Sequence, residues 1–226
     1  MPLFLDDMDY TAFARRLAWS PDGTFLLTPG SQMIAEKQES VIGETTRHVC
    51  YGFLKAQINK PAFMLPGMDD PVTAIRFHPR LFSRREGRSA LIDLPYTMLY
   101  ALATSSALMI YCTDSTKPQA IIKQPHLDTV NDLTWAEDGA KAVLVSASSD
   151  GFCSLVDVDL AALGLAPAAE SDIPEELREY YTSRNAVGFE ASVDAIKREM
   201  AGKNCTFVNV GFRSKKNQKD VTMIAC

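Results

Sequence analysis

His48 and Cys50 are the two closest residues whose types could support acid–base or thiol chemistry. On a strand, residues two apart face the same side, which is the minimum arrangement for a cysteine nucleophile with a histidine base. Nothing in the neighbouring sequence would orient the histidine, so chance adjacency is the favoured interpretation. The sequence contains no H-E-x-x-H, no phosphate-binding glycine loop and no nucleophile elbow. We therefore expect no catalytic residue, no metal and no cofactor, and a protein that is not an enzyme.

The cysteines also give no indication of a metal site. They are odd in number, scattered and without a C-x-x-C pair: Cys50, Cys112, Cys153, Cys205 and Cys226. This pattern fits the reduced thiols of an intracellular protein better than a disulfide framework or a zinc site.

Charged residues gather in two places where they could meet a partner. One predicted loop and its preceding strand are rich in arginine, at Arg76, Arg80, Arg84, Arg85 and Arg88. Guanidinium groups bind phosphate or acidic segments, so we name Arg80, Arg84, Arg85 and Arg88 as a candidate partner-contact loop. The acidic residues that could meet a basic surface are Asp6, Asp7, Asp9, Asp69 and Asp70. For both sets, plain solvation is the favoured alternative.

The composition is that of a globular chain able to bury a core, with 226 residues, 46% of them hydrophobic and 23% charged. A net charge of −5 does not match bare DNA and is compatible with basic partners. The N-terminus MPLFLDDMDY is acidic where a signal peptide is basic, which argues against secretion. Residues 94–112 carry no charge, but Pro95 and a Thr-Ser-Ser cluster interrupt them. Two buried strands around a turn at Ser105-Ser106 explain this stretch better than a membrane span.

The elements that must position these residues are repeated. The segments RRLAWSPDGTFLLT (15–28), VTAIRFHPRLF (72–82) and VNDLTWAEDGAKAVLVSASSDGFCSLVDVD (130–159) each begin with an alternating strand that ends on an aromatic anchor, Trp19, Phe77 or Trp135. The first and third continue through a turn, S-P-D-G or A-E-D-G, into a second strand. Aspartate followed by glycine between apolar runs is a strong hairpin signal.

Further strands complete the same plan. Third and fourth strands are predicted at HVCYGFLK and PAFMLPG in the first repeat, and the second adds YALATSSALMIYCTD and a strand near residues 118–122. Four strands joined by turns are the plan of a propeller blade. Ordinary hairpins of a β-sandwich are the alternative. The pattern predicts an all-β fold, a partial WD40 β-propeller of about three blades.

We expect the chain to be a fragment, because propellers close with typically 4 to 8 blades. The third repeat shows no obvious fourth strand after Asp159, and in many propellers that strand comes from the other end of the chain. We predict a partial propeller over residues 1–164 and, over 165–226, a tail with short helices that is partly disordered. Helices are expected at IPEELREYY and ASVDAIKREM.

The amino-acid sequence of the repeats resembles that of the later blades of the WD-repeat subunit of chromatin assembly factor 1 over residues 2–164. The most telling matches are Arg15-Arg16-Leu17, Leu94-Pro95-Tyr96 and Asp150-Gly151-Phe152-Cys153. The resemblance implies a nuclear, non-catalytic WD-repeat subunit of a histone chaperone complex that deposits histones H3–H4 during replication- and repair-coupled assembly. It implies other chromatin assembly factor subunits and H3–H4 as partners, with no sequence-specific nucleic acid and no membrane.

Two alternatives remain: a relative of the histone regulator HIRA of replication-independent assembly, and a generic WD-repeat scaffold. In WD blades a histidine placed like His126 often bonds the turn aspartate, here Asp150. The resemblance implies structural turn positions at Trp19, Asp22, Gly23, Trp135, Asp138, Gly139, His126, Asp150 and Gly151. No resemblance is found from about residue 185.

Overall fold

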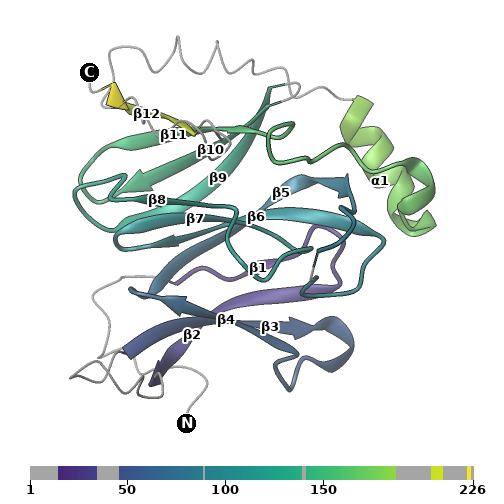
Figure 1. The fold of residues 1–226 in the computed structure, drawn as a ribbon, viewed down its shortest axis with the longest axis horizontal. Helices are drawn as coiled ribbons and strands as arrows, with labels where there is room; N and C mark the ends of the chain where they lie inside the picture. The colour runs from purple at the N-terminus through teal and green to yellow at the C-terminus, as the bar shows by residue number, and fades with distance from the viewer. Residues whose placement is uncertain are drawn as a thin grey trace.

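The computed structural model describes residues 15–34, 46–88, 90–138, 141–186, 205–210 and 223–224 of the chain. In this part of the chain the strands form three sheets, two of four strands and one of five. The sheets lie beside one another in chain order, with the second between the other two (Figure 1). We call them the first, second and third blades. The predicted all-β fold of about three blades is confirmed.

The first and second blades follow the predicted sequence of strands and turns, and the third follows it through its first three strands. The first blade contains β1 (Ala18–Trp19), β2 (Phe25–Ile34), β3 (Thr46–Leu54) and β4 (Phe63–Met68). The second contains β5 (Val72–Ser83), β6 (Tyr96–Thr104), β7 (Ala107–Cys112) and β8 (Ala120–Lys123). The third contains β9 (Val130–Asp138), β10 (Lys141–Ser148), β11 (Cys153–Asp159), β12 (Cys205–Val210) and β13 (Met223–Ile224). All neighbouring strands pair antiparallel except β11 and β12, which are parallel.

The second blade is buried on both faces, and this explains its long uncharged stretch. Every residue of β6 is buried. Met98 and Tyr100 pack in the core shared with the first blade, whereas Leu99 and Ala101 pack in the core shared with the third. A strand covered on both sides has little place for charged residues. The prediction of two buried strands is confirmed, and no helix in the described part of the chain is long and apolar enough to cross a membrane.

Hydrogen bonds link the first strands of the three blades. The Arg16 amide donates to the Thr73 carbonyl (2.8 Å), and the Ile75 amide donates back to the Arg16 carbonyl (3.1 Å). One blade further on, the buried Thr73 hydroxyl donates to the Val130 carbonyl (2.7 Å). These bonds fix the order and spacing of the three blades.

The segment after β11 also packs on the blades. Leu160, Leu163 and Leu165 belong to the core between the second and third blades. Further on, Ile173 and Tyr181, the latter on α1 (Glu175–Ala186), belong to the core between the first and second. The first predicted tail helix is confirmed by α1, while ASVDAIKREM lies outside the described residues. The division of the chain at residue 164 stays a prediction.

The third blade has a strand where none was apparent from the sequence directly after Asp159. β12 lies beside β11 in the fourth position of this sheet. The segment has a strand-like sequence, but because β12 comes from beyond α1 and pairs parallel, the local alternation that identifies hairpins gives no sign of its pairing with β11.

Candidate functional site

The three repeat anchors differ in their surroundings. Trp135 Nε1 donates to the carbonyl of Arg76 on the second blade (3.1 Å). Phe77 packs edge-on against Phe25 of the first blade, with ring centroids 5.5 Å apart. Each of these anchors therefore seals a joint with the preceding blade. Trp19 remains 44% exposed.

The turn of the first blade is built around Asp22. Its carboxylate accepts hydrogen bonds from the Ser20 hydroxyl (2.5 Å), the Thr24 amide (3.0 Å) and the Tyr96 hydroxyl of the second blade (2.7 Å). Burial, and then the bond to Asp22, raises the pKa of Tyr96. Gly23 adopts φ +68°, which favours glycine. Asp22 thus orders its own turn and ties it to the next blade.

His126 lies between a buried serine and the turn aspartate of the third blade. Its Nε2 is 2.8 Å from Ser146 Oγ and its Nδ1 is 3.3 Å from Asp150 Oδ2. Asp150 also accepts the amides of Leu127 (2.8 Å) and Phe152 (2.9 Å). Burial lowers the pKa of His126, although Asp150 opposes this effect. For Asp150, burial opposes ionisation but the two amide bonds outweigh it and lower the pKa.

This order of serine, histidine and aspartate is that of a hydrolase triad, so its surroundings decide its role. Ser146 is completely buried on β10, between β9 and β11, where no substrate can reach its hydroxyl. Gly151 follows Asp150 at φ +85° and closes the turn. The arrangement therefore holds a loop against a turn.

In the other turn of this blade, Asp138 pairs with Lys141 in register, while Gly139 lies outside the described residues.

Within the arginine loop, the Arg85 side chain is largely buried and is bonded to other parts of the chain. Arg85 Nε donates to Asp114 Oδ2 (2.6 Å), Nη2 pairs with Oδ1 of the same carboxylate, and Nη1 donates to the Leu163 carbonyl (2.6 Å). The two charged side chains are 11% and 3% exposed. Burial opposes the charge of Arg85, but the hydrogen bond and charge of Asp114, together with Cys112, outweigh burial and raise the pKa of the guanidinium. Arg85 therefore connects the second blade to the turn that follows the third.

The other arginines of the loop lie nearer the surface. Arg84 pairs with Asp93 (2.6 Å), and Arg88 donates to the Gln119 side chain (3.0 Å). The backbone amide of Arg80 donates to His78 Nδ1 (3.1 Å). Of the four candidate contact residues, Arg84 and Arg88 are the exposed ones.

An ion-pair network that the sequence did not reveal joins the three blades at their first strands, β1, β5 and β9. Asp132 of the third blade pairs with Arg76 of the second (2.8 Å) and with Arg16, which precedes β1 (3.3 Å). Arg76 Nε also donates to the Leu133 carbonyl (3.1 Å). The only available sign was the recurrence of a charged residue near each anchor, which does not identify a partner.

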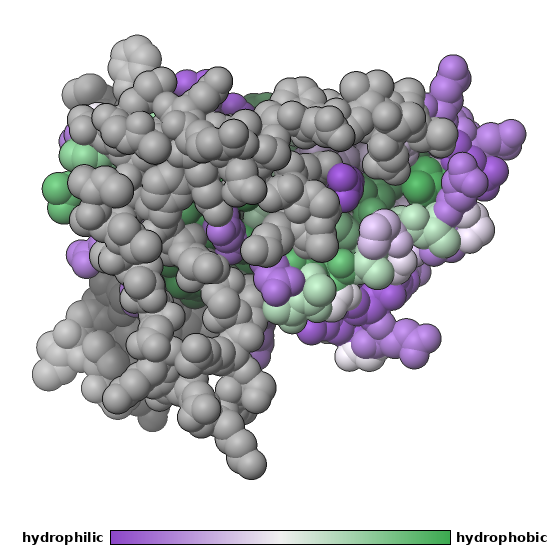
Figure 2. All heavy atoms as spheres, turned by 90° about the horizontal axis from the view of Figure 1, so that it is seen from above, coloured by the Kyte–Doolittle hydropathy of each residue, from purple (hydrophilic) through white to green (hydrophobic). Residues whose placement is uncertain are grey.

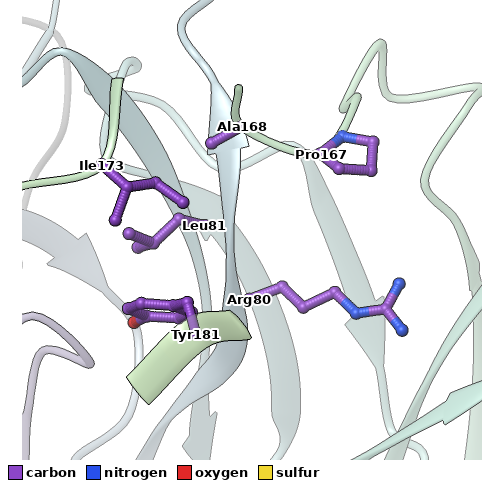
Figure 3. Close-up of a pocket in the computed structure, with 6 residues that line it drawn as sticks. All are labelled: Arg80, Leu81, Pro167, Ala168, Ile173 and Tyr181. Atoms are coloured by element: carbon purple, nitrogen blue, oxygen red, sulfur yellow. The ribbon is translucent and has the colours of Figure 1, made fainter. Parts of the chain in front are cut away.

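A small cavity of about 240 Å³ lies between β5 and the segment around α1. Ile173, Leu81 and Tyr181 gather on one side, and the Arg80 side chain extends away from them (Figure 3). The remaining lining residues are Pro167 and Ala168. On the face seen in Figure 2, hydrophilic residues gather at the end where α1 lies, beside a hydrophobic patch. The lining suits an apolar side chain and holds no acid–base pair.

The remaining chemically interesting residues also have structural settings. Burial raises the pKa of the Cys50 thiol, and that of Cys112 to about 12, so neither is a thiolate at neutral pH. Burial lowers the pKa of His48. Within the described part of the chain, no group of three or more His, Cys, Asp or Glu side chains is placed to hold a metal ion.

The acidic candidates are partly engaged. Asp69 pairs with Arg47, and Asp70 accepts a hydrogen bond from the Ser106 hydroxyl. Asp6, Asp7 and Asp9 lie outside the described residues.

Comparison with known proteins identifies the family. The family model described as the CAF1B/HIR1 beta-propeller domain matches residues 1–163. The chain belongs to the CAF1B/HIR1 β-propeller family. The resemblance to the WD-repeat subunit of chromatin assembly factor 1 found in the sequence is thereby confirmed.

Individual relatives of this CAF1B/HIR1 propeller come from plants, animals and fungi. The chromatin assembly factor 1 subunit FAS2 homolog of Oryza sativa is 36% identical over 160 residues, which cover 70% of this chain and 30% of the relative. A chromatin assembly factor 1 subunit of Mus musculus is 32% identical over 173 residues, covering 72% and 28%. Protein HIR1 of Chaetomium globosum is 27% identical over 194 residues, covering 84% and 16%. The chain thus spans less than a third of the length of these relatives.

Proposed function

We propose that this propeller is a non-catalytic subunit of a nuclear histone chaperone complex that deposits H3–H4 in replication- and repair-coupled chromatin assembly. Its proposed partners are other chromatin assembly factor subunits and H3–H4, with no sequence-specific nucleic acid and no membrane. The observation that carries the proposal is the 36% and 32% identity to chromatin assembly factor 1 subunits across the blades.

The geometry supports a binding platform. Titratable groups that could do chemistry serve instead to hold turns and blades: His126 binds a turn aspartate, and Arg85 binds Asp114. Rigid blades with solvent-exposed loops are suited to protein binding, because the loops present side chains in fixed positions.

We assign the partner contact within the arginine loop to Arg84 and Arg88. Both are exposed, and their bonds to Asp93 and Gln119 are surface bonds that a carboxylate of a partner can replace. Arg85 is internally paired and has a positioning role in this proposal. The contact partner is an acidic segment of another chromatin assembly factor subunit.

The test measures binding of the purified full chain to the purified large chromatin assembly factor subunit at low and moderate salt. Arg84→Ala combined with Arg88→Ala should weaken binding about tenfold, equivalent to about 1.4 kcal/mol. The control combines Lys55→Ala with Lys60→Ala, which removes the same charge from exposed positions of the first blade. Equal affinity of both double variants would refute the assigned contact, and no binding by the folded wild type would refute the function.

A HIR1-like role in histone regulation is the second candidate. The match to HIR1 of Chaetomium globosum covers 84% of this chain, compared with 72% for the mouse chromatin assembly factor 1 relative. The lower identity of the HIR1 match, 27% against 32%, favours the chromatin assembly factor role. Preferential binding to HIR-complex subunits over the large chromatin assembly factor subunit would favour this alternative.

A further inference from the structure

We propose that Cys153 and Cys205 are an oxidation site at which a reversible disulfide fixes β12 to the third blade. The two cysteines are direct partners in the parallel register of β11 and β12. They form the first of six consecutive pairs that end at Val158 and Val210. The proposal is independent of the proposed function.

The backbone arrangement meets the requirement for a disulfide. Neighbouring strands lie about 4.7–4.9 Å apart. Cysteines are bridged when their Cα atoms are about 4.4–6.8 Å apart. Register partners on adjacent strands fall within this range without any movement of the sheet.

The described cysteines offer no comparable pair. Cys50 lies opposite Pro29 and Leu65 in the first blade, and Cys112 lies opposite Leu99 in the second. Both are completely buried, whereas Cys153 is only partly buried. Oxidation is therefore expected between β11 and β12 of the third blade and not at the completely buried cysteines of the other two blades.

The oxidant is a low-molecular-weight disulfide of the glutathione type. The thiolate of one cysteine attacks a sulfur of this disulfide, whose S–S bond breaks and releases one reduced thiol. The thiolate of the second cysteine then attacks the mixed disulfide and releases a second reduced thiol. Two electrons pass from the protein to the reagent, and the two protons lost by the cysteines appear on the released thiols.

The link changes how β12 is held. β12 is not joined to β11 by a hairpin, since α1 and further residues separate them in the chain. In the reduced form, the pairing of β12 with β11 depends on non-covalent contacts. Oxidation closes a covalent loop and keeps the edge of β11 covered. The link breaks by the same thiol–disulfide exchange when reduced thiol is in excess, which makes the site reversible.

The test treats the reduced, purified full chain with oxidised glutathione and analyses a non-reducing digest by mass spectrometry. The expected product is a peptide pair joining Cys153 to Cys205 that disappears after reduction. Oxidation should also slow hydrogen exchange of the 205–210 amides roughly tenfold or more, since opening of β12 is suppressed.

Three serine variants separate the outcomes. Cys153→Ser and Cys205→Ser should each abolish the link, while Cys226→Ser should leave it intact. The wild-type digest gives the answer even if a variant folds poorly. A link that uses Cys226, glutathione adducts without a link, or unchanged exchange at 205–210 would each overturn the proposal.

Discussion

The loops and turns of the second and third blades are held by different polar groups. In the second blade, Arg85 and Asp114 form a bidentate ion pair that is almost completely buried. In the third, His126 and Asp150 form a contact that also collects two backbone amides. The guanidinium remains charged at any ordinary pH, whereas the imidazole is kept neutral by burial. The same fold thus combines a permanent ion pair with a titratable contact in adjacent blades.

The largest expected effect comes from removing the arginine of the buried pair. Arg85→Ala leaves the Asp114 carboxylate buried without its counterion, and should lower the free energy of unfolding by roughly 3–5 kcal/mol. Urea unfolding of the full chain measures the loss. Arg84→Ala is the matched control, because its partner Asp93 is 91% exposed, and should cost less than about 1 kcal/mol. Similar losses for both variants would show that burial of the Arg85 pair is not what matters.

The turn aspartate of the third blade should rank next. Asp150→Ala removes the acceptor of two amides and the neighbour of His126, at a cost of roughly 2–3 kcal/mol in the same unfolding experiment. Asp128→Ala serves for comparison, since the Asp128 carboxylate is exposed and accepts the amide of the adjacent Thr129. If Asp128→Ala is the more damaging change, the turn of the third blade is not organised around Asp150.

The pH dependence of stability should distinguish the two blades. Burial lowers the pKa of His126 below its usual 6.5, so the unfolded chain takes up a proton first as pH falls. The contribution of His126 to the free energy of unfolding is fully present above about pH 6.5. Below that pH it is lost, by at most about 1.4 kcal/mol for each pH unit. His126→Asn does not titrate and should flatten this slope in unfolding curves measured at successive pH values.

Some acid sensitivity should remain in the His126→Asn variant. Burial lowers the pKa of His78 to about 3, and burial also lowers that of His48, so both act in the same direction. Arg84→Ala should leave the slope of this pH range unchanged, because its partner Asp93 is 91% exposed and no buried carboxylate loses its counterion. An unaltered slope in His126→Asn would contradict the neutral state of the histidine.

The smallest expected effect concerns the tight turns of the two blades. Gly151 adopts φ +85° and has open space where a Cβ would be, so Gly151→Ala should cost about 1 kcal/mol from backbone strain alone. In the corresponding turn of the second blade, Ser105 does not have a positive φ, and Ser105→Ala should change stability by less than about 0.5 kcal/mol. Thermal unfolding that ranks the two changes in reverse would contradict this difference.

The sequence predicted the blades because their signals are local. Alternating apolar residues and the turns near Gly23 and Gly151 lie within a few residues of the strands they join. The partnership of His126 and Asp150 was anticipated through resemblance to WD blades, in which the two positions have a known relation. Family membership followed from the wording of the same segments.

The sequence did not predict contacts between distant segments. Arg85 meets Asp114 and the Leu163 carbonyl only after the blades are assembled, so its inward direction was not visible in an arginine-rich loop. The parallel pairing of β12 with β11 has the same origin, since no hairpin links the two strands. The network of Arg16, Arg76 and Asp132 likewise requires three blades to be placed together.

The most direct test of the proposed role is co-precipitation of the tagged full chain from cells, probed for the large chromatin assembly factor subunit and for H3–H4. We predict recovery of the large subunit, with histone recovery that decreases as salt is raised. Recovery of neither partner with soluble, monodisperse chain would contradict the role in chromatin assembly while leaving the propeller fold unaffected.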